Sequence, residues 1–425
     1  MGTTRAMTTK PSSGASEFRA GWKVLVAGII GVACGASPVP FNVIGFAIDP
    51  IRAETGWSVG GISLGFTVFG IVAALLAPFY GWLSDRYGVR IVAILSTVGF
   101  AAAFAFVGLI PTTSIAWFYF AWLMVGLVGI GSTPVTWSRA INMWFNKSRG
   151  LALGLLLMGT SLCALTVPRI AVWAISEWGW RGMFLFLSLL PLLVAVPTAL
   201  AWFREPKPEE MPTYDGGPAK ALTGATIGQA MRDRRFWTLW ISIALVAVAY
   251  GGAHVHMPKI IGQHGMPPDT AASIMGLIGV AVMAGRIITG WLFDRFWAPL
   301  VCLPILLVPA LACWLLTGTD ADKPAILAAA FMLGFAAGAE ADVIAFLSSR
   351  YFGMANYGKI YGLLYVPFAM LSGLSPAIYG WVKDTTGSYD AMLISAAALF
   401  ASGALLLLTL GRYPDFATTS AETPA

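Results

Sequence analysis

The sequence predicts an all-α membrane protein in which twelve transmembrane helices form two pseudo-symmetric six-helix bundles. Composition, a series of apolar runs and an internal repeat lead to this prediction. Of the 425 residues, 58% are hydrophobic and only 11% are charged, which is too apolar a balance for a water-soluble protein of this size. A bilayer core takes roughly 20 apolar residues per helix, and such runs follow one another along the chain.

The apolar runs predict six helices in each half of the chain. The helices of the first half are expected at residues 22–46, 58–81, 89–109, 114–144, 150–175 and 180–202. Those of the second half are expected at residues 236–261, 270–293, 300–316, 324–351, 358–379 and 389–410. The resulting regions are a disordered cytoplasmic tail at 1–20, a bundle at 21–203, a cytoplasmic linker at 204–235, a second bundle at 236–411 and a tail at 412–425.

Positive charge predicts the orientation of the chain. Most Lys and Arg residues fall on the side of the membrane that holds both termini and the stretch from Arg204 to Arg235. Because basic loops stay in the cytosol during insertion, both termini are expected there, in a multi-pass protein of the cell inner membrane. The net charge of +6 follows this topology rather than one patch, so nucleic acid is not an expected partner. We expect a monomer in a lipid bilayer.

Two stretches of the first half recur in the second at an offset of roughly 208 residues. GWLSDR at 81–86 recurs as GWLFDR at 290–295, and the aromatic pair and glycines of 144–154 recur at 351–362. Several landmarks at one offset indicate an internal duplication, which places a solute path between the halves near the membrane midplane.

The segment GWLSDRYGVR at 81–90 resembles the loop signature of the major facilitator superfamily, between its helices 2 and 3. The resemblance implies the major facilitator fold, transport of a small solute by a membrane gradient, and a gating role for this loop and its repeat. The residues concerned are Gly81, Asp85, Arg86, Gly88, Arg90, Asp294 and Arg295. A positive-inside loop with a tight turn at Gly88 explains the same pattern structurally.

A second resemblance narrows the group. WFNKSRGLALG at 144–154 and the Gly285-Arg286 pair are similar to bacterial relatives of the monocarboxylate transporters and oxalate/formate antiporters. The chain departs from the animal transporters at Val282, where they have an aspartate one turn before the arginine. The resemblance implies a small organic anion, in particular a monocarboxylate, as substrate.

Charges inside the predicted helices are the candidate functional residues, because a charge near the bilayer centre costs at least about 2.5 kcal/mol. Arg286 offers a fork that fits a carboxylate, so it is the leading candidate for anion binding. A permanent ion pair with Glu340 or Asp342 is the alternative. Those two carboxylates are candidate proton carriers, or else they compensate Arg286 or Arg139.

Four further residues lie at depths suited to a cavity: Arg139, Trp137, Tyr250 and Tyr365. We interpret them as substrate-binding candidates, with snorkelling of the arginine and aromatic core packing as the alternatives. His254 and His256 are interpreted as polar residues at the membrane boundary, where either could titrate near neutrality.

The sequence has no phosphate-binding loop of the GxxxxGK[ST] type, no His/Cys metal cluster and no nucleophile elbow. An enzyme and a cofactor are therefore not expected. The leading expectation is a proton-coupled secondary transporter of a small organic anion that works by alternating access. The alternatives are an anion exchanger, a carrier of another small solute and, more remotely, a transport-inactive sensor.

Overall fold

The computed structural model describes residues 14–145, 148–207, 210, 224–293, 295–353 and 355–414. Within them, eleven helical segments are long and apolar enough to cross a membrane. One of these, Leu151–Trp202, has 52 residues, and Gly179 breaks it with a φ of 67°. Because this break lies where the sequence predicts a turn between two helices, the segment crosses twice, and the described chain crosses twelve times as predicted.

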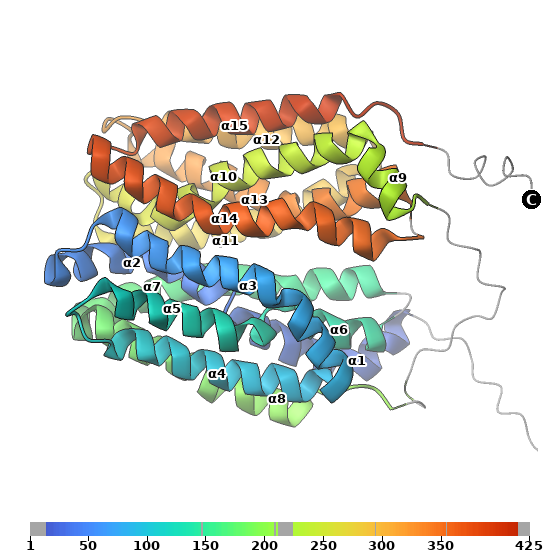
Figure 1. The fold of residues 1–425 in the computed structure, drawn as a ribbon, viewed down its shortest axis with the longest axis horizontal. Coiled ribbons are helices and arrows are strands. Elements are labelled where there is room, and N and C mark those ends of the chain that lie inside the picture. The colour runs from blue at the N-terminus through green and yellow to red at the C-terminus, as the bar shows by residue number, and fades with distance from the viewer. Residues whose placement is uncertain are drawn as a thin grey trace, which may run out of the picture.

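The helices form two bundles that lie side by side in Figure 1. The N-half comprises α1 (Gly14–Ala33), α2 (Pro38–Thr55), α3 (Val59–Tyr87), α4 (Val89–Leu109), α5 (Ile115–Gly129), α6 (Pro134–Trp144), α7 (Arg149–Leu190) and α8 (Val196–Trp202). After the short α9 (Ile227–Arg232), the C-half comprises α10 (Arg234–Gln263), α11 (Pro268–Phe293), α12 (Ala298–Leu315), α13 (Lys323–Phe352), α14 (Tyr357–Thr386) and α15 (Asp390–Leu408). We call the end near α9 and the last turn of α15 the terminal end, and the opposite end the far end.

The internal repeat survives in the hydrogen bonds of the two halves. Trp144 Nε1 donates to the Arg204 carbonyl, and Tyr351 Oη donates to the Gly411 carbonyl, in both cases 60 residues further on. The first amide of the third helix in each half is also bound by a side chain beyond the sixth. Val89 N donates to Glu205, and Ala298 N donates to Tyr413 Oη. Both bundles are therefore tied at the terminal end by the same construction.

Two helices that were predicted to be continuous are broken in the middle of the N-half. The first membrane segment is interrupted between Ala33 and Pro38, and the fourth at a short 3₁₀ turn, Ile130–Ser132. The breaks face each other, because Ala36 N donates to Ser132 Oγ over 3.0 Å. Proline begins each outgoing helix, at Pro38 and Pro134, where its missing N–H costs nothing.

The start of the first helix and the end of the linker also add detail that the sequence did not predict. Helix α1 begins at Gly14 rather than near residue 22, and its buried Glu17 accepts from Ser148 N. A short helix, α9, lies near the end of the linker, with a capping box between Thr226 and Gln229. Arg234 and Arg235 donate to the Thr409 and Leu410 carbonyls, so their positive charges complement the negative end of α15.

The two halves touch at the far end and in the middle. Helices α3 and α14 approach closely at Gly60 and Gly380, and again at Gly70 and Gly373. An added Cβ at Gly380 would lie 2.7 Å from Gly60 Cα. Helices α7 and α11 meet in the same way, where a Cβ at Gly279 would lie 2.8 Å from the Ser161 carbonyl oxygen.

The same helix faces separate toward the terminal end. Gly81 and Gly362 each lie eleven residues from the Gly70–Gly373 contact, which is about 16 Å along the helix and within about 20° of the same face. In the described part of the chain, nothing lies within 4 Å of a Cβ built at either glycine, nor at Gly154 or Gly290 on α7 and α11. Among the described residues, the glycine contacts that join the halves are therefore not continued at the terminal end, and we refer to the space between these helix faces as the cleft.

Candidate functional site

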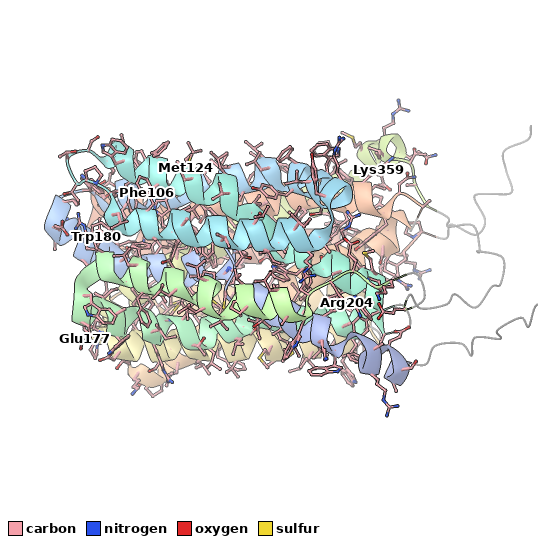
Figure 2. The ribbon with its side chains drawn as sticks, turned by 90° about the horizontal axis from the view of Figure 1, so that it is seen from below. Phe106, Met124, Glu177, Trp180, Arg204 and Lys359 are labelled. Carbon is pink, nitrogen blue, oxygen red and sulfur yellow. The ribbon has the colours of Figure 1, made fainter. Side chains whose placement is uncertain are left out.

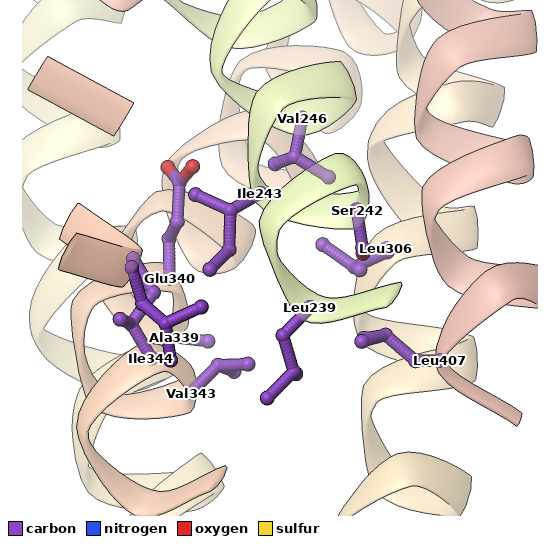
Figure 3. A pocket seen from close by; sticks show the side chains of 11 residues that line it. Leu239, Ser242, Ile243, Val246, Leu306, Ala339, Glu340, Val343, Ile344 and Leu407 are labelled. Carbon is purple, nitrogen blue, oxygen red and sulfur yellow. The ribbon is translucent and has the colours of Figure 1, made fainter. Parts of the chain in front are cut away.

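The site begins at Glu340, a carboxylate near the middle of α13. It is 7% exposed, and one helical rise per residue places it within about 4 Å of the centre of that helix. Figure 3 shows its side chain beside Ile243 of α10, at the edge of a small cavity of about 30 Å³ whose other lining is mostly apolar. Glu340 Oε1 has no hydrogen-bond partner among the described residues.

Two tyrosines from neighbouring helices complete the carboxylate's surroundings. Tyr250 of α10 and Tyr365 of α14 both lie within electrostatic range of Glu340. Tyr250 is 9% exposed, and Tyr365 is 36% exposed. The structure thus brings together three of the residues that the sequence singles out, on three different helices of the C-half.

Arg286 lies on the other side of α13. Helices α11 and α13 pack backbone to backbone, and a Cβ at Gly338 would lie 3.0 Å from Arg286 N. Glu340 is two residues beyond Gly338, a rotation of about 200°, and therefore faces α10 instead of α11. The sequence left two ion pairs open for this arginine, with Glu340 or with Asp342. The direction of Glu340, which faces α10, does not support the first of them. The side chain of Asp342 lies outside the described residues.

His254, one turn further along α10 than Tyr250, extends the cluster toward the N-half. Its Nδ1 lies 2.9 Å from Tyr250 Oη. Its ring stacks on Phe41 of α2 with the centroids 4.4 Å apart and the planes inclined by 9°. We call Glu340, Tyr250, His254 and Tyr365 the central polar cluster.

His256 is also enclosed by protein, whereas the sequence suggested polar residues at the membrane boundary for both histidines. It is fully buried, and its Nδ1 lies 2.9 Å from Tyr389 Oη. Its Nε2 donates to the Pro376 carbonyl and lies 3.3 Å from Ser63 Oγ of the N-half. The sequence could not reveal this, because the partners come from three helices distant in the chain.

Further polar contacts join the halves at the far end. The Asp384 carboxylate of α14 accepts from Val59 N at 3.1 Å and from Gly60 N at 2.6 Å, so it caps the start of α3. Asp49 of α2 forms an ion pair with Lys259 of α10. Together with the Ser63–His256 contact, these contacts form what we call the far-end links.

The sequence model described as "Major Facilitator Superfamily" matches residues 27–376. The chain belongs to this superfamily. It is similar to monocarboxylate transporter 13 of Bos taurus, with 27% identity over 89% of this chain and 84% of that protein. It is also similar to monocarboxylate transporter 11 of Homo sapiens, with 24% identity over 96% and 86%. An uncharacterized 38 kDa protein of Thermoproteus tenax is 31% identical over 85% and 89%.

Solved structures agree with the superfamily fold. A bacterial homolog of the human lysosomal transporter Spinster, described as inward-facing and unoccupied, aligns with a TM-score of 0.63 at 16% identity. The alignment covers 94% of this chain and 96% of that one. The family, the relatives and the apolar helices together identify a multi-pass membrane transporter and not an enzyme.

The superfamily signature loop lies between α3 and α4. Gly88 has a φ of 85°, which bears out the tight turn expected there. Arg90 donates to the Leu200 carbonyl. Arg86 lies over the ring of Trp82 on the same helix, and Arg295, just beyond the end of α11, lies over the ring of Trp291. Asp294 and the side chain of Asp85 lie outside the described residues. No described residue lies within 4 Å of a Cβ built at Gly81, at the start of this signature.

Two further candidates from the sequence, Trp137 and Arg139, lie on α6 of the N-half, whereas the central polar cluster belongs to the C-half. Trp137 is fully buried, packs on Gly31 and Phe203, and donates from Nε1 to the Ser132 carbonyl. It is thus a core residue of the N-half rather than a residue of the cavity wall, because its ring fills the space beside the broken helices. Arg139, on the same helix α6, is half-buried.

An aromatic row on α14 was not anticipated. Tyr357, Tyr361 and Tyr365 repeat every four residues, and their rings follow one another at 5.7 and 5.8 Å between centroids. Phe368 continues the row at 5.0 Å. The row runs from the terminal end to the central polar cluster. The four-residue spacing of the tyrosines can be seen in the sequence, but the stacking of their rings cannot.

Proposed function

We propose that the protein is a secondary active transporter that carries a small organic anion, in particular a monocarboxylate, together with protons by alternating access. The observation that carries the proposal is Glu340, a buried carboxylate near the middle of α13 within electrostatic range of two tyrosines. Burial of a carboxylate disfavours its charged form, so the group can take up and release a proton as its surroundings change. Such groups are kept in membranes for function.

The anion requires a cationic group within reach of the cleft. Arg286 lies about 8 Å from the middle of α11 toward the terminal end, and its planar fork can bind a carboxylate through two hydrogen bonds. Tyr250 and Tyr365 provide hydroxyl groups beside Glu340, and Arg139 is a second cation on the N-half side. Asp342 remains a second candidate for the proton. The relatives named monocarboxylate transporters support this substrate class.

The contrast between the two ends of the protein supports alternating access. The far-end links close one end, and the glycine faces of α3, α14, α7 and α11 separate at the other. The excess of Lys and Arg on the side that holds both termini supports assigning the terminal end to the cytoplasm. We therefore propose a monomer of the cell inner membrane with both termini in the cytoplasm, and a signature loop that restrains the terminal end as the halves rock.

The test is uptake of radiolabelled mono- and dicarboxylates into proteoliposomes with an imposed pH gradient. Wild type is compared with Arg286→Gln and with Arg19→Gln, a control on an exposed arginine of α1. We expect proton-driven uptake of at least one monocarboxylate, a fall of about 100-fold in Arg286→Gln and no change in the control.

Other outcomes separate the alternatives. Equal uptake by wild type and Arg286→Gln would contradict the anion-binding role of this arginine. Uptake that needs a counter-anion inside the vesicle and ignores the pH gradient would replace proton coupling with exchange. Failure to take up or exchange any acid would overturn the proposed substrate class.

A further inference from the structure

Two histidines on α10 have different hydrogen-bond environments. Both nitrogens of His256 have partners. His254 is 5% exposed and uses only Nδ1, while its buried Nε2 has no partner within the described part of the chain. Buried polar atoms are nearly always paired, because an unpaired one has lost its water without replacement. His256 is explained by the fold, and Nε2 of His254 is not.

The imidazole of His254 is held in a defined orientation. Tyr250 Oη fixes Nδ1 at 2.9 Å, and Phe41 lies flat against the ring. When the tyrosine hydroxyl donates to Nδ1, the proton of the neutral imidazole resides on Nε2. The free position is then an N–H donor, which suits an oxygen of an anion.

The position of this donor connects it with the proposed transport site. Tyr250, its hydrogen-bond partner, lies within electrostatic range of Glu340. Phe41 belongs to α2 of the N-half and His254 to α10 of the C-half. These two helices are in close contact beside the histidine, since a Cβ built at Gly45 would lie 2.1 Å from the Val255 carbonyl oxygen. Separation of α2 from α10 would remove Phe41 from the ring and open the imidazole to the cleft.

We propose that His254 is a specificity-determining residue whose Nε2–H binds a hydroxyl, oxo or second carboxyl oxygen of the transported anion in the state that is open at the far end. The assignment rests on the proposed function, since it refines which organic anions are carried. It makes acids with a second oxygen function better substrates than the plain alkanoic acids of the same length. In the state open at the terminal end, Phe41 covers the ring, so this contact is lost on release.

The experiment compares matched acids in proteoliposomes: lactate with propionate, and 3-hydroxybutyrate with butyrate. Each pair differs by one hydroxyl group, and the readout is the ratio of kcat/KM for the two acids. His254→Phe keeps a ring to stack on Phe41 but has no donor. We expect the ratio to fall about tenfold or more, through the KM of the hydroxy acid, with the plain acid changed less than about twofold.

A second variant and the wild type keep the outcomes distinct. His254→Gln retains an N–H donor, and we expect it to give a ratio between those of wild type and His254→Phe. Size-exclusion chromatography shows whether His254→Phe folds; if it does not, His254→Gln is measured in its place. Equal loss for both acids of a pair would reduce His254 to a structural residue. An unchanged ratio, or wild type without preference for the hydroxy acids, would overturn the proposal. Wild type that takes up no acid refutes the proposed function itself.

Discussion

The N-half and the C-half are built alike but differ in chemistry at their midplanes. Both are tied at the terminal end by matching bonds, from Trp144 in one and Tyr351 in the other. At the position that corresponds to Glu340, the N-half has Thr133, the residue directly before a half-helix that begins at a break. The C-half instead keeps α13 continuous and buries a carboxylate there. The scaffold is thus preserved from the duplication, while the ionisable groups have diverged.

The largest effect should come from the two corresponding midplane positions. Glu340→Gln removes a titratable group, whereas Thr133→Ser keeps the hydroxyl that bonds the Ile130 carbonyl. We expect Glu340→Gln to lose accumulation driven by a pH gradient while solute counterflow stays within about threefold, because only proton movement needs the carboxylate. Thr133→Ser should retain both activities. Normal gradient-driven accumulation in Glu340→Gln would mean that another group carries the proton, and Asp342→Asn would be the next variant to test.

The far-end links should respond next. Asp384→Asn weakens the cap on α3, because an amide oxygen binds backbone N–H groups less strongly than a carboxylate. Labelling of Ser63→Cys by a membrane-impermeant thiol reagent should become about tenfold faster. In the N-half, the repeat offset relates Asp384 to the neighbourhood of Glu177. This glutamate is exposed and lies at the far end (Figure 2). Glu177→Gln should leave the rate unchanged, and equal effects of the two variants would contradict an asymmetric closure.

The matching scaffold bonds predict a smaller pair of effects. Trp144→Phe and Tyr351→Phe each remove one donor to a chain carbonyl, at a cost of about 1 kcal/mol, and Trp144→Phe also removes part of a buried ring, so its shift should be the larger. Thermal unfolding in detergent should shift down by about 2 to 4 °C for each variant. A shift in only one of them would mean that the two halves do not share this support.

The smallest effect compares two ion pairs at the far end. The Asp49–Lys259 pair joins the halves, while the Arg181–Glu54 pair lies within the N-half at 2.5 Å. Partly exposed pairs contribute little, so Lys259→Gln should raise labelling of Ser63→Cys by about threefold. Arg181→Gln should not change it. A larger effect of Arg181→Gln would mean that the N-half itself opens at this end.

The sequence by itself determined the number of crossings, the duplication and the superfamily. These follow from hydrophobic runs and repeated motifs, which depend on neighbouring residues or on long-range sequence identity. It also selected Glu340, Tyr250 and Tyr365, because a charge or hydroxyl in an apolar run stands out without any knowledge of packing. Gly88 was predictable for a local reason, since its turn requires a positive φ.

Only the tertiary structure decided which of these residues act together. Arg286 and Glu340 lie on neighbouring helices and yet on different sides of α13, a relation set by the glycine contact between α11 and α13. Trp137 was expected in a cavity and is instead packed in the N-half core, because the neighbouring helices are broken there. His254 and His256 looked alike as sequence positions. The partners of His256 and the Phe41 ring that stacks on His254 come from helices distant in the chain, and helix packing alone placed them there.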